Sequence, residues 1–231
     1  MQFVQFQDLS KSFGTKEILK DINLDLEKGK IYGLLGPNGS GKTTMIKIIN
    51  GLLQPSSGKI LINGCEPGIE SKKIISYLPE RTYLNMNMKV SELIQFFKDF
   101  YDDFDEKKAI KLLYKLKIKE TDQLKNMSKG TKEKVQLVMV MSRKADLYVL
   151  DEPIGGVDPA SRDYILETIL TNFNEDASIL ISTHLISDIE KILDQVIFIN
   201  QGKIVLNEDA DTIRKKKKTT IDKLFREEFK C

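Results

Sequence analysis

The sequence predicts an α/β protein with a mostly parallel sheet as its core, an N-terminal antiparallel β layer and an inserted α-helical subdomain. Over residues 146–206, short apolar runs alternate with helix-like runs, which is the pattern of a parallel sheet with covering helices. Over residues 1–30, apolar and polar residues alternate around turns, whereas a helical period governs residues 81–145. The length of 231 residues and the apolar content of 41% suit one large domain of this kind.

Residues 1–80 are expected to hold the antiparallel layer and a phosphate-binding loop. Apolar residues that alternate with polar ones around turn residues favour short antiparallel strands. A further strand is predicted over Lys59–Asn63, because turn-forming residues flank it at 55–58 and at Gly64. The apolar positions of the first strands are Phe3, Phe6, Leu9, Ile18, Ile22, Leu24 and Leu26.

The octapeptide GPNGSGKT, at residues 36–43, follows an apolar run and precedes a helix-like run. In this context the pattern G-x-x-x-x-G-K-[ST] binds phosphate, whereas a glycine-rich turn without a ligand is the weaker alternative. Backbone N–H groups and the N-terminus of the following helix would surround the phosphates. Lys42 can reach the β- and γ-phosphates, and the Thr43 hydroxyl can ligate Mg²⁺. The predicted nucleotide-binding residues are Gly36, Pro37, Asn38, Gly39, Ser40, Gly41, Lys42, Thr43 and Thr44.

Two acidic residues, Asp151 and Glu152, end a short buried-strand pattern, ADLYVLDEP. Mg²⁺ prefers oxygen ligands, and Asp151 at a strand end can hold it. Glu152 would then lie beside the γ-phosphate, where a carboxylate can orient or deprotonate the attacking water. A surface Asp-Glu pair is the alternative, and the phosphate loop upstream in a chain of this size disfavours it.

With these motifs in place, the chain resembles the ATP-binding subunits of ABC transporters over nearly its whole length. The resemblance implies a P-loop NTPase core that uses ATP with Mg²⁺. It implies that Phe13 stacks on adenine, although an aromatic residue in a first hairpin is as often part of a core. His184, the only histidine, matches the family's catalytic histidine that contacts the γ-phosphate. Asp158 matches the loop that reaches across a dimer interface to the partner's nucleotide.

Two family motifs are present in altered form. The signature, usually LSGGQ, reads Met127-Ser128-Lys129-Gly130-Thr131 here. In the family this segment binds the γ-phosphate held by the other subunit, so Ser128, Lys129 and Gly130 are expected to act in trans; Ser128 also suits a helix cap. Glu80 stands where the family usually has a glutamine, and its carboxylate is predicted to ligate Mg²⁺. Both departures bear on the rate and coupling of hydrolysis, and they recur in a subset of bacterial type-2 exporters that the chain resembles.

Residues 81–145 are expected to form the helical subdomain. Apolar residues recur at helical spacing from Leu93 to Phe104, with Ser91 placed to cap the start and Asp105 to cap the next helix. We interpret the aromatic stripe of this first helix as core, and residues 135–141, apolar nearly all round, as a helix buried on several faces. By resemblance, contacts from a membrane subunit should gather just after Glu80, at Thr82, Tyr83 and residues 85–88.

The C-terminal part returns to strands and helices. Strands are predicted over 147–150, 179–182, 196–200 and 203–206, and helices over about 159–172 and near 186–193. The whole chain, 1–231, is expected to be one domain, with residues 1–80 and 146–206 as the catalytic core and 207–231 as a basic, amphipathic tail. The run RKKKK at 214–218 is either a solvated surface or a contact with anionic lipid. The apolar residues 221–229 that follow could dock on the domain, pair with a second copy or touch a membrane.

Composition excludes some functions. The 36 basic residues nearly balance the 34 acidic ones, which implies no broad basic field but argues neither for nor against nucleic acid by itself. No nucleic-acid partner is expected. No signal peptide is recognisable at the start, and no run approaches the ~18 apolar residues that span a bilayer. Cys65 and Cys231 fit neither a disulfide framework nor a metal site, which favours free thiols in the cytosol. The resemblance adds a peripheral position on the inner face of the cell membrane.

The resemblance implies an ATP-driven clamp. The sequence holds one phosphate loop, so a second copy or a paralogous ATPase subunit is expected as partner, together with an integral membrane transporter subunit. The expected activity is ATP hydrolysis that drives export of an unknown substrate, with amphipathic peptides, antimicrobials or drugs as the suggested classes. The alternatives are a soluble or regulatory ABC-type ATPase not coupled to transport, and a phosphate-loop kinase or GTPase, which Asp158 and His184 disfavour.

Overall fold

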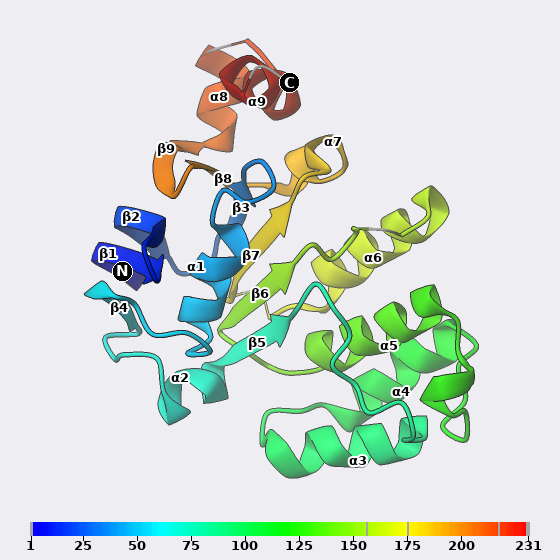
Figure 1. Cartoon of the computed structure of the whole chain (residues 1–231). Helices are drawn as coiled ribbons and strands as arrows, with labels where there is room; N and C mark the ends of the chain where they lie inside the picture. The colour runs from blue at the N-terminus through cyan, green and yellow to red at the C-terminus, as the bar shows by residue number, and fades with distance from the viewer. Residues whose placement is uncertain (1, 156, 175, 217, 230–231) are drawn as a thin grey trace.

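The computed structural model describes residues 2–155, 157–174, 176–216 and 218–229, with the backbone alone for 159–161 and 216. Figure 1 shows its helices and strands as two sheets with helices around them. In chain order they are β1 Gln2–Phe13, β2 Lys16–Glu27, β3 Ile31–Leu35, α1 Lys42–Ile49, β4 Ser57–Ile62, α2 Ile69–Ile74, β5 Ile75–Leu78, α3 Val90–Phe100, α4 Glu106–Lys115, η1 Leu124–Asn126, α5 Lys129–Met141, β6 Leu147–Asp151, α6 Pro159–Asn172, β7 Ser178–Thr183, α7 Ile186–Ile189, η2 Glu190–Ile192, β8 Gln195–Asn200, β9 Lys203–Asp209, α8 Ala210–Lys216 and α9 Ile221–Phe229.

The larger sheet confirms the predicted α/β class. Its strand order is β5-β6-β7-β3-β8-β9, and only the last pairing, β8 with β9, is antiparallel. Strands β6 and β7 are buried along their whole length, as strands covered on both faces are. Because β3, β6 and β7 are parallel neighbours, the residues that follow each of them meet at one edge of the sheet.

The smaller sheet is the predicted antiparallel layer, with the order β2-β1-β4. Its first two strands are longer than the short strands we expected, at 12 residues each. Irregular pairing makes this length possible: the β1–β2 register shifts between Phe6 and Leu9, where Asp8 has a φ of 47°. A bulge of this kind lets a strand continue through polar residues that would be taken for a turn from the sequence alone.

The helical subdomain is built from α3, α4 and α5, which Figure 1 places beside β5. Helix α5 serves two cores, since Val135, Val138 and Met139 face the helical cluster while Leu137 and Val140 face the cluster of the main sheet. This double role explains why the helix is apolar nearly all round.

The predicted helix caps are confirmed in two cases out of three. The Asp105 carboxylate accepts the backbone N–H of Lys108 at 3.0 Å, and Ser128 Oγ accepts that of Thr131 at 3.2 Å. Ser91 is not a cap, because α3 already begins at Val90 and the Glu92 carboxylate accepts the N–H of Lys89 instead.

The aromatic stripe of α3 is core only in part. Phe97 is buried and contacts Tyr101 and Phe104, whereas Phe96 and Phe100 are exposed and stack on each other with centroids 4.5 Å apart. Aromatic residues at i and i+4 share one helix side, and here that side turns to solvent.

The amphipathic C-terminal segment docks on its own domain. Ile221 of α9 is buried, and the rings of Phe225 and Phe229 contact Phe198 of β8. The preceding basic run is partly paired, since Arg214 and Lys215 both contact Asp211; Lys217 and Cys231 lie outside the described residues. None of the described helices combines the length and the apolar character needed to cross a bilayer.

Candidate functional site

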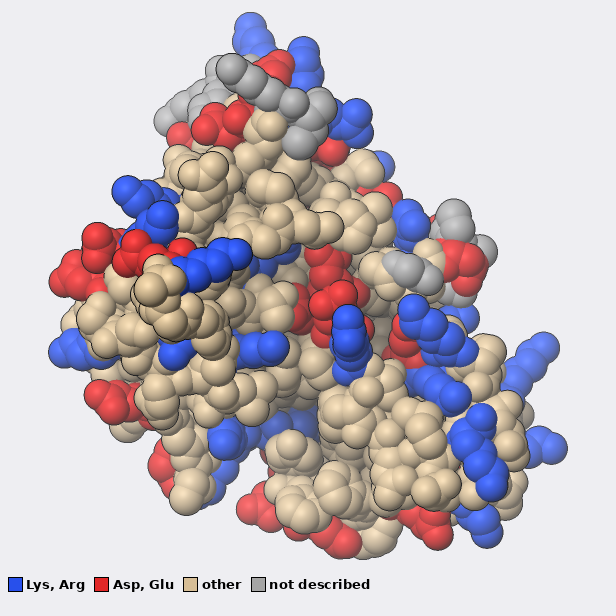
Figure 2. Space-filling model, viewed as in Figure 1, with Lys and Arg blue, Asp and Glu red and all other residues tan. Residues whose placement is uncertain are grey.

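Part of the predicted site residues line one cleft of about 1120 Å³ at the carboxyl ends of the parallel strands. Figure 2 shows acidic side chains near the middle of the face that it draws, with Lys and Arg side chains on both sides. A cleft with cations around a carboxylate floor suits a phosphate chain that carries a metal ion. Its lining residues include Phe13, Lys16, Asn38, Gly39, Gly41, Lys42, Thr43, Thr44, Glu80, Arg81, Lys129, Lys132, Glu133, Glu152 and His184.

The phosphate loop leaves β3 and runs directly into α1. Two of its glycines are required by the backbone. A Cβ at Gly36 would lie 2.3 Å from the carbonyl oxygen of Ile199, and Gly41 has a φ of 115°, which L side chains rarely adopt. The loop is further fixed where the Gly202 N–H donates to the Ser40 carbonyl at 3.0 Å. These backbone contacts fix the curvature of the loop.

Lys42 is the first residue of α1 and lies largely buried under the loop. Its ammonium donates to the carbonyl of Gly36 at 2.6 Å and to that of Pro37 at 3.2 Å. Burial lowers the pKa of Lys42, and the carboxylates of Glu152 and Asp151 oppose that shift. A cation held by two neutral carbonyls can exchange them for phosphate oxygens, which form stronger hydrogen bonds with it.

Asp151 ends β6 and is 1% exposed. Burial raises the pKa of its carboxyl group, and hydrogen bonds from Ser182 and Thr43 oppose the rise. Ser182 Oγ donates to Oδ1 at 2.5 Å, whereas Oδ2 has no hydrogen-bond partner among the described residues.

This arrangement fits a divalent cation with oxygen ligands. A buried carboxylate oxygen without a partner, next to the hydroxyl of Thr43, is the donor set that Mg²⁺ takes when phosphates and water complete its shell. Within the described part of the chain, no three His, Cys, Asp or Glu residues form an all-protein metal cluster.

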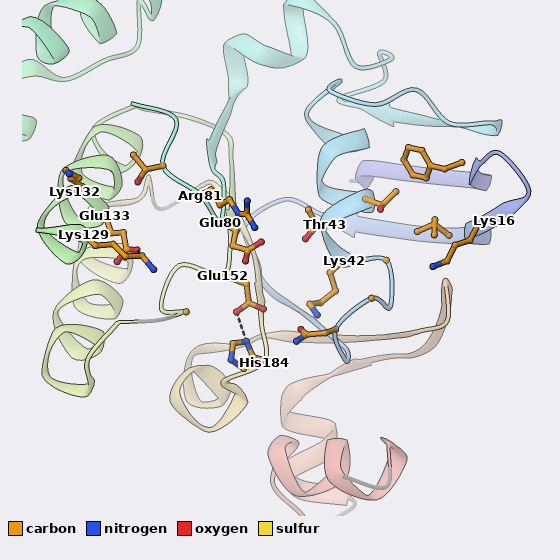
Figure 3. Close-up of a pocket in the computed structure, with 18 of the residues that line it drawn as sticks. Lys16, Lys42, Thr43, Glu80, Arg81, Lys129, Lys132, Glu133, Glu152 and His184 are labelled. Atoms are coloured by element: carbon orange, nitrogen blue, oxygen red, sulfur yellow. Dashed lines mark hydrogen bonds and ion pairs between the residues drawn. The ribbon is translucent and has the colours of Figure 1, made fainter. Parts of the chain in front are cut away.

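Glu152 and His184 form a direct pair across the floor of the cleft. The Nδ1 atom of His184 lies 3.0 Å from Oε2 of Glu152, as the dashed line in Figure 3 marks. Glu152 has a φ of 52°, and its backbone N–H donates to the Ser182 carbonyl at 2.9 Å. Positive φ in a non-glycine residue is uncommon and concentrates at functional sites. The turn after β6 thus aims the Glu152 carboxylate into the cleft.

Phe13 ends β1 at the rim of the cleft and is 50% exposed. It is therefore not a core residue. The Lys11 ammonium lies 5.1 Å from the centre of its ring. An exposed ring beside the phosphate loop is available for stacking on a base.

The signature residues lie on the opposite wall from the phosphate loop. Figure 3 shows Lys129, Lys132 and Glu133 on one side of the Glu152–His184 pair and Lys42 and Thr43 on the other. The side chain of Lys129 is 83% exposed, and its ammonium is 3.8 Å from the Glu133 carboxylate.

The remaining predicted residues are placed less directly. Ser128 and Asp158 are exposed, and Gly130 is half-buried. Gly156, in the same loop as Asp158, lies outside the described residues. Glu80 follows β5 and is exposed at the edge of the cleft. The predicted roles of these residues stay predictions.

Several cleft residues were missed by sequence reasoning. Ser182 lies two residues before His184, and a hydroxyl at a strand end is a weak signal on its own. Arg81, Lys132 and Glu133 lie within two residues of the motifs, but nothing in the sequence indicates which charged side chains face the cleft.

Comparison with known proteins agrees with the geometry of the cleft. The sequence model of a family described as ABC transporter matches residues 19–155. The lantibiotic transport ATP-binding protein SrtF of Streptococcus pyogenes is 32% identical over 210 residues, which cover 90% of this chain and 91% of that protein. The SkfA peptide export ATP-binding protein SkfE of Bacillus subtilis (strain 168) is 33% identical over 211 residues, covering 89% and 88%. A solved ATP-binding subunit of an ABC transporter has a TM-score of 0.87 and 28% identity, with coverage of 97% and 98%.

Proposed function

The chain belongs to the family of ABC transporter ATP-binding proteins, and from this membership we propose that it hydrolyses ATP to drive export through a separate membrane subunit. One observation carries the proposal. Lys42, Thr43, Glu152 and His184 come from three separate segments and line one cleft beside the phosphate loop, and Asp151 ends the strand directly before Glu152.

We assign each group a role in hydrolysis. The loop N–H groups and Lys42 hold the phosphate chain of ATP. Glu152 orients a water molecule and accepts its proton while the water oxygen bonds to the γ-phosphorus and ADP leaves. His184 fixes the Glu152 carboxylate through its Nδ1 atom, which lies 3.0 Å from Oε2.

Mg²⁺ is the metal that we propose for this site. Thr43 and Asp151 would hold it, and Glu80 at the edge of the cleft is a further candidate ligand. When bound, the ion neutralises charge on the phosphates. Phe13 would stack on the adenine ring at the rim of the same cleft.

A second copy or a paralogous chain completes the site in our proposal. Lys129, at the start of α5, lies across the cleft from the phosphate loop, and Ser128 and Gly130 flank it in the sequence. The exposed ammonium of Lys129 and the start of α5 would meet the γ-phosphate bound to the partner, with Asp158 beside them.

The relatives suggest the transport direction and the class of cargo. SrtF is described as a lantibiotic transport protein and SkfE as a peptide export protein. We therefore propose an amphipathic peptide or antimicrobial as cargo and a peripheral position on the cytoplasmic face of the membrane. Thr82, Tyr83 and residues 85–88, next to Glu80, are proposed to contact the membrane subunit.

The replacement Glu152→Gln tests the hydrolytic role. Gln keeps the size of the side chain but cannot accept a proton, so hydrolysis should slow by about 10²-fold or more while ATP still binds. A dimer should accumulate with ATP, as light scattering would show. The variant, its control and the wild type would be compared by phosphate release and by calorimetric titration with ATP and Mg²⁺.

The matched control is Glu227→Gln, which removes an exposed carboxylate on α9 and should leave turnover unchanged. Normal hydrolysis by Glu152→Gln would remove Glu152 from the catalytic role. A wild-type chain that binds ATP without turnover would favour a regulatory cassette. The carboxylate of Glu80 in the cleft is the feature that supports this alternative.

A further inference from the structure

A second, much smaller cavity lies directly behind Glu152. It has a volume of about 30 Å³ and is lined by residues of α5, of α6, of the ends of β5 and β6 and of the loops that follow these strands. The main cleft and this cavity share part of their lining, and Glu152, the proposed catalytic residue, lines both. The residues common to both linings are Glu80, Thr82, Glu133, Glu152 and Gly155.

Gln136 of α5 lines this cavity and has no evident structural role. The residue is 2% exposed, and its Oε1 atom has no hydrogen-bond partner within the described residues. Leaving a buried polar group unpaired costs about 1–3 kcal/mol, so such groups are rare in native proteins and need an explanation. The neighbours of Gln136 in the helix are apolar, and a Met or Leu would fit this environment without that cost.

A second unpaired acceptor lines the same cavity. Oδ2 of Asp151, the oxygen proposed to hold Mg²⁺, is also buried without a partner among the described residues, and its second lone pair can accept a hydrogen bond. Two acceptors cannot bond to each other, but one water molecule has two O–H groups and can donate to both. A volume of about 30 Å³ exceeds the roughly 10–15 Å³ that a buried water needs.

We propose that a water molecule in this cavity donates to Gln136 Oε1 and to Asp151 Oδ2, and that Gln136 is thereby a positioning residue. The water ties α5 to the end of β6, and Glu152 is the next residue after Asp151. Gln136 touches neither ATP nor the reacting atoms; it acts through the water on the turn that aims the catalytic carboxylate.

If the proposed function holds, the location of Gln136 on α5 couples the partner's nucleotide to the position of Glu152. Helix α5 begins beside Ser128, the residue proposed to meet the nucleotide of the partner. Gln136 lies eight residues further along the helix, or about 12 Å at 1.5 Å per residue. One rigid helix therefore joins the segment that senses the partner's nucleotide to the turn that holds the chain's own Glu152.

The replacement Gln136→Met tests this role, because it keeps the length of the side chain and removes the amide. The kcat for ATP should fall about tenfold, since small displacements of a catalytic group slow the chemical step strongly, while KM changes less than about twofold. The melting temperature should stay within about 3 °C of the wild type, because Met fills nearly the same volume as Gln in this largely apolar environment.

The matched control is Ser142→Ala, at the end of the same helix. Ser142 Oγ is also buried without a partner among the described residues, but it does not line the cavity. This variant should keep the wild-type kcat. A Gln136→Met chain with the wild-type kcat would overturn the proposal. A fall in kcat no larger than the fall in the fraction of folded protein would overturn it as well.

A high-resolution crystal structure of the wild-type chain without nucleotide tests the water itself. Density for a water about 3 Å from both Gln136 Oε1 and Asp151 Oδ2 would support the proposal. An empty cavity, or a protein donor on Gln136, would overturn it. This experiment does not depend on turnover, so it separates a failure here from a failure of the proposed ATPase activity.

Discussion

Lys42 joins the phosphate loop to the acidic floor of the cleft. Its ammonium is bonded to the carbonyls of Gly36 and Pro37, and its charge faces Glu152, Asp151 and Glu80. Burial lowers its pKa from the ordinary value of 10.5, and the three carboxylates oppose the shift. Lys42 therefore supplies a positive charge at the point where the phosphates are expected to bind.

Replacing Lys42 with Ala should weaken ATP binding by roughly ten- to a hundredfold, the equivalent of losing one or two charge-assisted hydrogen bonds. Calorimetric titration with ATP measures the change directly. Lys47→Ala is the matched control, since Lys47 lies on the same helix, is exposed and does not line the cleft. Equal affinities for Lys42→Ala and Lys47→Ala would contradict the assignment of the loop.

At the residue scale, contiguous motifs were predictable and single buried contacts were not. The loop 36–43, the Asp151–Glu152 pair and His184 could be read because each follows a strand pattern directly. Gln136 was passed over because it interrupts an otherwise apolar helix by one residue. Only the packing of α5 against the β-strand ends reveals that its amide is buried without a partner.

At the element scale, Arg143 anchors the end of α5 to α2 and β5. Its guanidinium lies 2.9 Å from the Asp103 carboxylate and donates to the carbonyls of Ile75 at 2.5 Å and Lys73 at 2.7 Å. Its Cζ atom is 3.9 Å from the centre of the Tyr101 ring. One buried cation thus satisfies carbonyls at the α2–β5 junction and ties the helical subdomain to the parallel sheet.

Arg143→Ala should lower the free energy of unfolding by about 3 kcal/mol or more, because it leaves a carboxylate and several carbonyls without their donor. Urea denaturation followed by circular dichroism measures this loss. The control is Arg226→Ala on α9, whose exposed pair with Asp222 should contribute no more than about 0.5 kcal/mol. A loss below about 1 kcal/mol for Arg143→Ala would show that the junction does not depend on this side chain.

Element types were predicted better than element limits. Periodicity predicted α3 and α4, the apolar run 135–141 predicted the buried part of α5, and short apolar runs predicted β6, β7, β8 and β9. The misplaced cap at Ser91 arose because Glu92 satisfies the N-terminus of α3 from inside the helix. Helix α2 was not predicted, since its six residues are too few to show a clear period.

At the scale of the whole molecule, the cleft has a phosphate-binding wall and a facing wall formed by the helical subdomain. The two walls belong to different parts of the fold and are joined through α5, whose opposite faces lie in different hydrophobic clusters. The sequence could not predict that α9 docks on Phe198, because the pattern of an amphipathic helix identifies its apolar face but not the surface that this face packs against.

Purification of the tagged chain from the membranes of its native host, in mild detergent, tests the transport claim most directly. We predict that a polytopic membrane protein copurifies with the chain. Its recovery should fall with Tyr83→Asp, which places a charge at an exposed position of the proposed contact segment while the ATP site stays intact. If the wild type and the Tyr83→Asp variant both recover only soluble or ribosomal proteins, the result would contradict the account and leave an ATPase that is not coupled to transport.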